Sequence, residues 1–405
     1  MSAAVHAVQT GWQVQLLEAA PHAGGRARRV MHQGLALDNG QHILIGAYRD
    51  TLALMRTVGV DADKQLWRLP LALLTPDGQG LQLPHWPSPW NMLAGIAGAR
   101  GWQWSDKWAF IQQARQWQRQ QFACPASMTV TQLCAGLPEA VMQMMIEPLC
   151  VSALNLPARQ ASAQVFLRVL QDALLGGRGS SDLLIPRHDL GALLPDAAVQ
   201  WLRQRGAQVH TAHRVTHLNA FETAPVILAC PAWQAAELTQ SVNPAWAAQA
   251  KSLTHTAITT VYLQAHARWH WPVPMLALSS QPDAPAQFVF DKGLLSGDPG
   301  LKGVLAAVVS ASEGERAQIT QAVQQQLREQ LNFPQATALF SVVEKRAAFA
   351  CTPGLHRPTA FVGPKLLACG DYVAGPYPAT LEGAVRSGQQ AVALLNAMDM
   401  GENTA

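Results

Sequence analysis

The sequence predicts an α/β protein of two domains, and three observations lead to this fold class. The chain has 405 residues, which is enough for two domains. Hydrophobic residues make up 49% of it, so a sizeable core can form. Near the N-terminus a helix pattern, a glycine and a strand pattern that ends in an acid follow one another. That order is typical of the second half of a dinucleotide-binding βαβ unit.

The first elements follow from local patterns. Residues 2–10 are rich in alanine and predict a helix that stops at Gly11. Residues 12–17 mostly alternate and predict a short strand, after which Glu18 is placed to accept hydrogen bonds from ribose hydroxyls. In the βαβ motif this acid follows the glycine-rich loop by about 20 residues. We therefore expect the first strand and that loop to precede residue 1, with the natural protein beginning about 15–20 residues earlier. The alternative is that Glu18 is a surface acid.

Composition excludes several classes of protein. Charged residues are only 14%, and Lys+Arg 29 against Asp+Glu 26 leaves a net charge of +3, which does not favour a nucleic-acid partner. The six cysteines form no CxxC pair and no zinc spacing, so we expect reduced thiols, a cytoplasmic location and no metal. The chain as given starts without a basic signal-peptide region, and no apolar run reaches about 18 residues.

A glycine-rich basic turn follows Glu18. Gly24 and Gly25 allow the backbone to approach a ligand closely, and Arg26 offers a guanidinium fork to phosphate. The alternative is an ordinary flexible basic loop. Next, residues 35–38 predict a strand that ends at Asp38, followed by Gly40 and His42. A second pattern lies far downstream, where an apolar strand at 365–369 is followed by Gly-Asp and then by Glu-Gly-Ala at the start of a helix.

These segments resemble the FAD-dependent flavoproteins of the amine oxidase and phytoene desaturase superfamily. The resemblance implies FAD as cofactor and an FAD/NAD(P)-binding, Rossmann-like domain with a discontinuous α+β substrate domain. It implies that Asp371 binds the ribityl chain and that the helix start faces the flavin pyrimidine oxygen. It also implies that Val215, between strands predicted at 206–210 and 226–230, lends its backbone to the adenine. The cofactor-binding residues it implies are Glu18, Gly24, Gly25, Arg26, Gly40, His42, Val215, Gly370, Asp371, Glu382, Gly383 and Ala384.

Within this superfamily, residues 38–48, 148–155 and 370–380 look like the hydroxysqualene dehydroxylase branch of bacterial hopanoid biosynthesis. That resemblance implies a long apolar isoprenoid substrate, hydroxysqualene, reduced to squalene with loss of water. The reaction needs a general acid to help the hydroxyl leave. The polar candidates are Asp38, His42 and Tyr372.

The spacing of the three segments predicts the domain plan. The FAD-binding domain would comprise residues 1–64, 195–245 and 345–399, and the substrate domain residues 65–194 and 246–344. The hydrophobic run 141–150 either lines a substrate tunnel or forms an ordinary buried helix. Six tryptophans lie within residues 86–117 beside basic residues. We favour a core role for them over the alternative, a peripheral contact with the inner face of the cell membrane.

Three other functions stay open. A carotenoid- or squalene-type desaturase would run the flavin chemistry in the oxidative direction. A flavin amine oxidase is the second, although no aromatic pair for an amine cage is evident. The third is a non-enzymatic prenyl-binding module that resembles GDP-dissociation inhibitors, against which the Gly-Gly-Arg and Gly-Asp segments argue.

Overall fold

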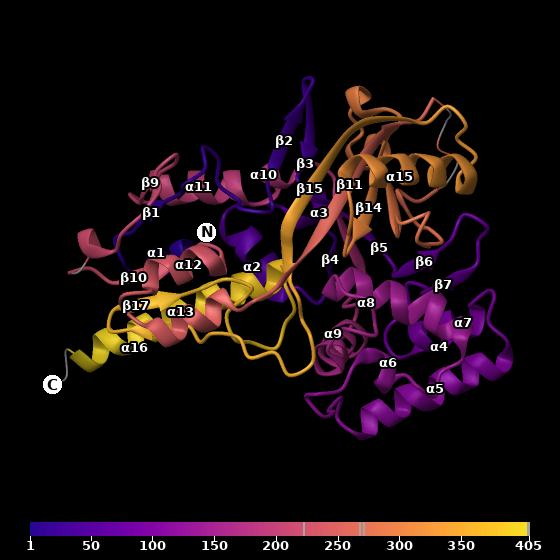
Figure 1. Ribbon diagram of the computed structural model, residues 1–405, viewed down its shortest axis with the longest axis horizontal. Helices are drawn as coiled ribbons and strands as arrows, with labels where there is room; N and C mark the ends of the chain where they lie inside the picture. The colour runs from indigo at the N-terminus through magenta and orange to yellow at the C-terminus, as the bar shows by residue number, and fades with distance from the viewer. Residues whose placement is uncertain (222, 267–268, 270–271, 403–405) are drawn as a thin grey trace.

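One region of the fold contains parallel strand pairs and is formed by the N-terminal, central and C-terminal parts of the chain. The structure is a computed structural model and describes residues 1–221, 223–266, 269 and 272–402. The strands of this region form one parallel pair and one three-stranded sheet: β1 (Gln15–Leu17) with β9 (Gln208–His210), and β10 (Val226–Leu228), β17 (Leu366–Ala368) and β16 (Phe361–Gly363). Its helices are α1 (Ser2–Gln9), α2 (Arg49–Thr57), α3 (Ala62–Gln65), α10 (Leu190–Leu193), α11 (Pro195–Gln204), α12 (Ala232–Thr239), α13 (Pro244–Lys251) and α16 (Leu381–Glu402), with η2 (Asn219–Phe221). Figure 1 shows this region on the left, with both termini.

A five-stranded antiparallel sheet lies at the upper right of Figure 1. Its strands in spatial order are β12 (Met275–Ala277), β13 (Phe288–Asp291), β14 (Val304–Ser310), β11 (His255–Gln264) and β15 (Thr337–Phe349). The helices attached to it are α14 (Lys292–Ser296), η3 (Pro299–Leu301) and α15 (Arg316–Gln330). Side chains of β11 alternate between two cores, because successive residues of a strand point to opposite faces. Val261 and Leu263 pack with residues of α15, whereas Tyr262 joins the larger core on the other face.

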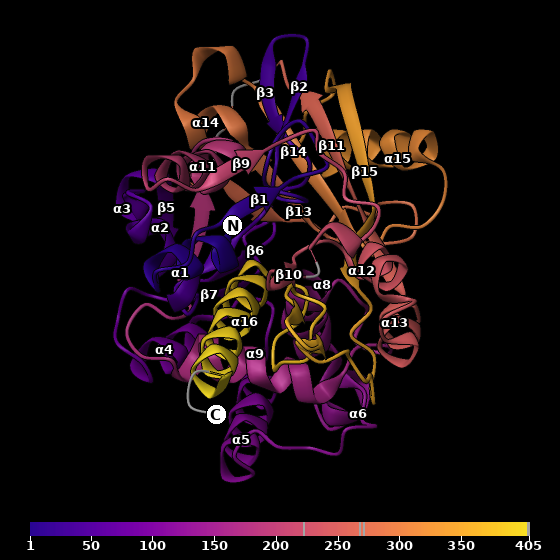
Figure 2. The ribbon, with the colours of Figure 1, turned by 90° about the vertical axis from the view of Figure 1, so that its left-hand side faces the viewer.

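The third region is helical and lies below the sheet in both ribbon views (Figures 1 and 2). It comprises α4 (Trp90–Gly98), α5 (Trp104–Arg119), α6 (Val130–Leu133), α7 (Glu139–Val141), the π-helix η1 (Met142–Ile146), α8 (Glu147–Leu154) and α9 (Ala163–Leu175). Pro148 follows the π-turn and has no N–H for a helical hydrogen bond, which is a local reason for the irregular winding. Small sheets connect the regions: β2 (Arg29–His32) with β3 (Leu35–Asp38), β4 (Leu44–Ile45) with β8 (Leu183–Pro186) and β5 (Leu66–Leu69), and β6 (Ala72–Leu74) with β7 (Gly80–Gln82).

The predicted elements compare closely with the observed ones, but two of the predicted domain boundaries fall inside elements. The boundary at 245/246 falls inside α13 and the boundary at 344/345 falls inside β15. β15 continues to Phe349 because its ladder with β11 runs to the pair His255–Phe349. The domain plan itself stays a prediction.

The tryptophans of residues 86–117 divide between the core and the surface. Trp102 and Trp117 are buried and pack edge-on against Phe110. Trp86, Trp90, Trp104 and Trp108 are exposed. The core role that we favoured from the sequence is therefore wrong for these four residues, because Trp86 before α4, Trp90 on α4 and Trp104 and Trp108 on α5 all expose their side chains.

Candidate functional site

The Gly-Gly-Arg and Gly-Asp segments meet in the structure. Arg26 donates one hydrogen bond to the Asp371 carboxylate at 2.5 Å and another to the carbonyl oxygen of Ala347 at 2.5 Å. Gly24 has φ +122°, and a Cβ built there would lie 2.5 Å from the carbonyl oxygen of Ala27. The turn therefore requires glycine at residue 24 and places the guanidinium of Arg26 against the end of β17.

Glu18 and the segment that carries Val215 also lie side by side. The N–H of Glu18 donates to His210 at 2.8 Å, and its carbonyl accepts from His213 at 2.8 Å. Its carboxylate accepts from the N–H of Ala20 at 2.8 Å. Val215 is half-buried two residues beyond His213, in a stretch without regular secondary structure. The two residues that the resemblance assigned to the ribose and the adenine thus belong to neighbouring segments.

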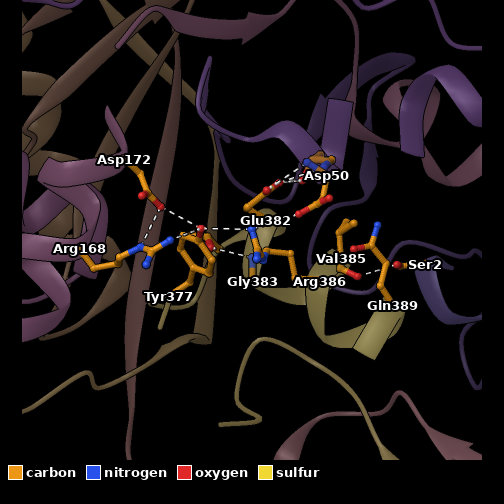
Figure 3. A network of polar contacts seen from close by, with 12 residues as sticks. Ser2, Asp50, Arg168, Asp172, Tyr377, Glu382, Gly383, Val385, Arg386 and Gln389 are labelled. Carbon is orange, nitrogen blue, oxygen red and sulfur yellow. Dashed lines mark hydrogen bonds and ion pairs between the residues drawn. The ribbon is translucent and has the colours of Figure 1, made fainter. Parts of the chain in front are cut away.

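The start of α16 is held by its own chain and by α2, as Figure 3 shows. The Glu382 carboxylate accepts hydrogen bonds from the N–H of Asp50 and from the N–H and hydroxyl of Thr51, the latter at 2.7 Å. Its side chain therefore caps α2, and the cofactor-binding role of Glu382 stays a prediction. The N–H of Gly383 donates to the Thr380 hydroxyl at 3.1 Å, and the N–H of Ala384 donates to the Thr380 carbonyl at 3.0 Å. These two N–H groups, expected to face the flavin, are satisfied within the chain.

The N-terminal turn of α1 packs against the second turn of α16. The hydroxyl of Ser2 donates to the carbonyl oxygen of Val385 at 2.7 Å (Figure 3). A Cβ at Gly388 would lie 2.8 Å from the nitrogen of Ala3, so only glycine permits this approach. The N-terminus of α1 and the guanidinium of Arg26 are each features that favour anionic groups such as a pyrophosphate.

The segment 38–42 forms a buried polar cluster. Asp38 is fully buried and pairs with Lys292 at 3.0 Å, while its other oxygen accepts from the N–H of Leu190 at 2.8 Å. Asp38 is thus a paired carboxylate, which does not suit the role of a general acid that we considered for it. A ring nitrogen of His42 lies 3.2 Å from the carbonyl oxygen of Gly40. Burial lowers the pKa of His42.

Tyr372 occupies a separate pocket of the core beside β17. It is 3% exposed, and burial raises the pKa of its phenol well above the usual value. Gly370 has φ +153°, and a Cβ there would lie 2.8 Å from the Tyr372 ring. The phenol oxygen has no hydrogen-bond partner in the part of the chain that the structure describes. The candidate catalytic role of Tyr372 stays a prediction.

Sequence reasoning missed Lys292, Gln41 and Tyr262. The Tyr262 hydroxyl accepts from the N–H of Asp38 at 3.0 Å and donates to its carbonyl at 2.9 Å. Lys292 and Tyr262 belong to the antiparallel sheet region, more than 220 residues from Asp38 in the chain. No spacing rule could connect them; the only local signal is that Asp291 and Lys292 directly follow the apolar run Phe288–Phe290.

The described residues fit an FAD molecule. Gly24 lies in a tight turn where a Cβ would clash, and the N-terminus of α1 and the guanidinium of Arg26 suit a pyrophosphate. Together these features define a dinucleotide-cofactor site of the flavoprotein type.

Comparisons with known proteins also identify a flavoprotein. The family model for flavin containing amine oxidoreductases matches residues 1–396, and the chain belongs to that family. It is 23% identical to the hydroxysqualene dehydroxylase of Zymomonas mobilis, covering 97% of this chain and 96% of that protein. It is 25% identical to the protein of the same name from Sinorhizobium fredii, covering 97% and 95%.

Solved structures share the fold. An oxidoreductase from Methanosarcina mazei superposes with a TM-score of 0.69 at 15% identity, covering 97% of each chain. A putrescine oxidase bound to putrescine has a TM-score of 0.67 at 14% identity, covering 98% of this chain and 96% of that chain. The expected fold class and FAD as cofactor are confirmed, and the chain is an FAD-dependent oxidoreductase.

Proposed function

We propose that this oxidoreductase reduces hydroxysqualene to squalene with reduced FAD, as a step of hopanoid precursor biosynthesis. The observation that carries the proposal is the match, over 97% of the chain or more, to three relatives that bear the name hydroxysqualene dehydroxylase. The identities are 23–25%, and the matches include both segments that meet at Arg26 and Asp371.

The reaction is a dehydroxylation with a simple balance. The carbon–oxygen bond of the alcohol breaks, a carbon–hydrogen bond forms, and the hydroxyl leaves with a proton as water. Reduced FAD supplies the hydride when it is bound. The protein must orient a long apolar chain and keep water away from the reacting carbon.

The helical region supplies suitable apolar walls. Val141, Met145 and Ile146 of the run 141–150 are fully buried, whereas Met142, Met144 and Leu149 are partly buried and pack against the same core. Methionine side chains adapt to irregular apolar ligands, which suits a flexible isoprenoid. This surface favours a lipid substrate over a small amine.

An anaerobic assay tests the proposal. Holoenzyme with pre-reduced flavin is mixed with hydroxysqualene, and the return of oxidised-flavin absorbance is followed while squalene is quantified. We expect reoxidation with one squalene per flavin. A holoenzyme that ignores hydroxysqualene but whose oxidised flavin is bleached by an amine would be an amine oxidase. Bleaching by a saturated isoprenoid would indicate a desaturase, and a protein that binds no flavin would indicate a prenyl-binding module.

We also propose that the enzyme contacts the inner face of the cell membrane through an aromatic surface formed by Trp86, Trp90, Leu93, Trp104 and Trp108. All five side chains are exposed, Trp104 by 76%. α4 and α5 carry four of these side chains, and the two helices are joined where the Lys107 ammonium donates to the Ala97 carbonyl oxygen at 2.7 Å. Lys107 also lies over the Trp104 ring. No helix of the described chain is long and apolar enough to cross a bilayer.

The basic residues near the aromatic surface indicate which kind of bilayer it would contact. Arg100, Arg115 and Arg119 are exposed on or beside α4 and α5. Tryptophan prefers the interface between lipid and water, and cations favour anionic headgroups. The proposed partner is therefore a bilayer that contains anionic phospholipid.

Vesicle sedimentation tests the membrane contact. The full chain should sediment with phosphatidylglycerol-containing vesicles and less with pure phosphatidylcholine. Replacing Trp104 and Trp108 together by serine should weaken binding about tenfold, because two interfacial anchors are lost. Met31→Ser is the matched control, since Met31 is 60% exposed outside this surface. Equal loss in both variants, or no binding by the wild type, would refute the contact.

A further inference from the structure

The side-chain amide of Gln41 has one satisfied end and one unsatisfied end. Its oxygen accepts from the Lys292 ammonium at 3.5 Å. Its nitrogen is buried and has no hydrogen-bond partner in the part of the chain that the structure describes. Buried polar groups are paired in the great majority of native proteins, so a buried donor without a partner marks a place where a ligand completes the bond.

The orientation of this amide is determined by Lys292. The Lys292 side chain is almost fully buried and held at 3.0 Å by the fully buried Asp38. Asp38 is held in turn by the Leu190 N–H and, through its backbone, by the Tyr262 hydroxyl. An ammonium group donates hydrogen bonds and accepts none. The amide oxygen of Gln41 must therefore face Lys292, and the NH₂ group must point away from it.

A second buried polar atom without a partner in the described chain lies on β11, close to the segment 38–42. The Thr260 hydroxyl is buried without a partner in the described chain. It lies 4.0 Å from the point where a Cβ on Gly40, the residue before Gln41, would be. Thr260 and Tyr262 are on the same face of β11, so this face of the sheet meets the segment 38–42 along its length.

We propose that the Gln41 NH₂ group donates a hydrogen bond to the hydroxyl oxygen of the bound alcohol and that Lys292 and Asp38 are positioning residues for this amide. The inference rests on the proposed function. Lys292, which orients the amide, and Thr260, which lies near Gly40, come from the antiparallel sheet region and not from the Gly-Gly-Arg or Gly-Asp segments. This favours the substrate over the flavin as the acceptor. The bond orients the carbon–oxygen bond and transfers no proton.

Binding measurements on the oxidised holoenzyme test this inference. Hydroxysqualene and squalene are titrated separately in detergent, and the shift of the flavin absorbance gives both dissociation constants. For Gln41→Leu we expect the dissociation constant of the alcohol to rise about five- to tenfold, as for a lost hydrogen bond between neutral groups. The dissociation constant of squalene and the flavin midpoint potential should not change. Gln41→Met keeps the length of the side chain but presents no N–H donor, so it should show the same selective loss.

Thr259→Val is the matched control. Thr259 lies on the same strand as Thr260, and its hydroxyl donates a hydrogen bond to the Ser312 hydroxyl at 2.9 Å. It should leave both dissociation constants unchanged. An equal weakening for alcohol and hydrocarbon in the Gln41 variants would mean a packing role and overturn the inference, as would a changed flavin potential with unchanged alcohol binding. If the wild type binds the alcohol and the variants bind it equally well, only this inference fails. If the wild type binds no hydroxysqualene, the proposed function and this inference both fail.

Discussion

Arg26 and Asp371 form an ion pair of 2.5 Å although 345 residues separate them in the chain. The pair joins the turn after β1 to the end of β17, so both halves of the candidate cofactor site depend on one guanidinium. The Asp371 side chain is 9% exposed, and removing Arg26 would leave that carboxylate with little compensation from water.

We expect Arg26→Ala to weaken FAD binding roughly tenfold or more, as for the loss of a charge-assisted hydrogen bond. Arg26→Lys should rescue little, because one ammonium cannot reproduce the planar fork that holds both Asp371 and Ala347. Flavin content after dialysis measures the effect. Arg29→Ala is the control, since Arg29 is similarly exposed but pairs with Asp189 and Asp196. Full flavin retention in Arg26→Ala would contradict the assignment.

Gly383→Val should lower flavin occupancy while the protein stays folded. A Cβ at Gly383 would lie 3.2 Å from the Pro378 carbonyl oxygen and 3.3 Å from Tyr377, so a branched side chain must displace the start of α16. Gly136→Val is the matched control, because nothing lies within 4 Å of a Cβ there. Absorbance of the purified proteins at the flavin band measures the difference. Equal occupancy in the two variants would show that the start of α16 does not contact the cofactor.

Glu382→Ala should destabilise the fold by about 2 kcal/mol, because it leaves the buried N–H and hydroxyl of Thr51 without an acceptor. Thr51→Val removes one of those donors and should cost about 1 kcal/mol. Urea unfolding of both single variants and the double variant measures the coupling. Strictly additive losses would mean that the two residues stabilise the protein independently.

His42 should make stability depend on pH. Burial is the main cause that lowers its pKa in the folded protein from the ordinary value of 6.5. Below about pH 6.5 the unfolded chain therefore binds a proton that the folded protein does not, and stability falls as the pH drops from there. His42→Asn lacks this proton and should lose less stability between pH 7.5 and 5. Urea unfolding across that range checks the prediction, which a constant difference between the two proteins would contradict.

The elements of the fold were predictable because their causes are local. Alanine-rich and alternating segments predicted α1 and β1, and Gly-Gly-Arg and Gly-Asp identified the flavoprotein fold, since these backbones require those residue types. The same reasoning could not say that the Glu382 carboxylate caps α2, because Asp50 and Thr51 lie about 330 residues away.

By itself the sequence determined the fold class, the family and the cofactor, since each depends on residue types at short, fixed spacings. Only the tertiary structure decided which side chains meet. It brought Lys292 to Asp38 across 254 residues, left Gln41 Nε2 without a partner among the described residues, and separated four exposed tryptophans from two buried ones. The physical reason is that a side-chain pairing between distant segments depends on how whole elements pack. Packing is determined by the sum of many apolar contacts, and it produces no periodic sequence pattern around either partner.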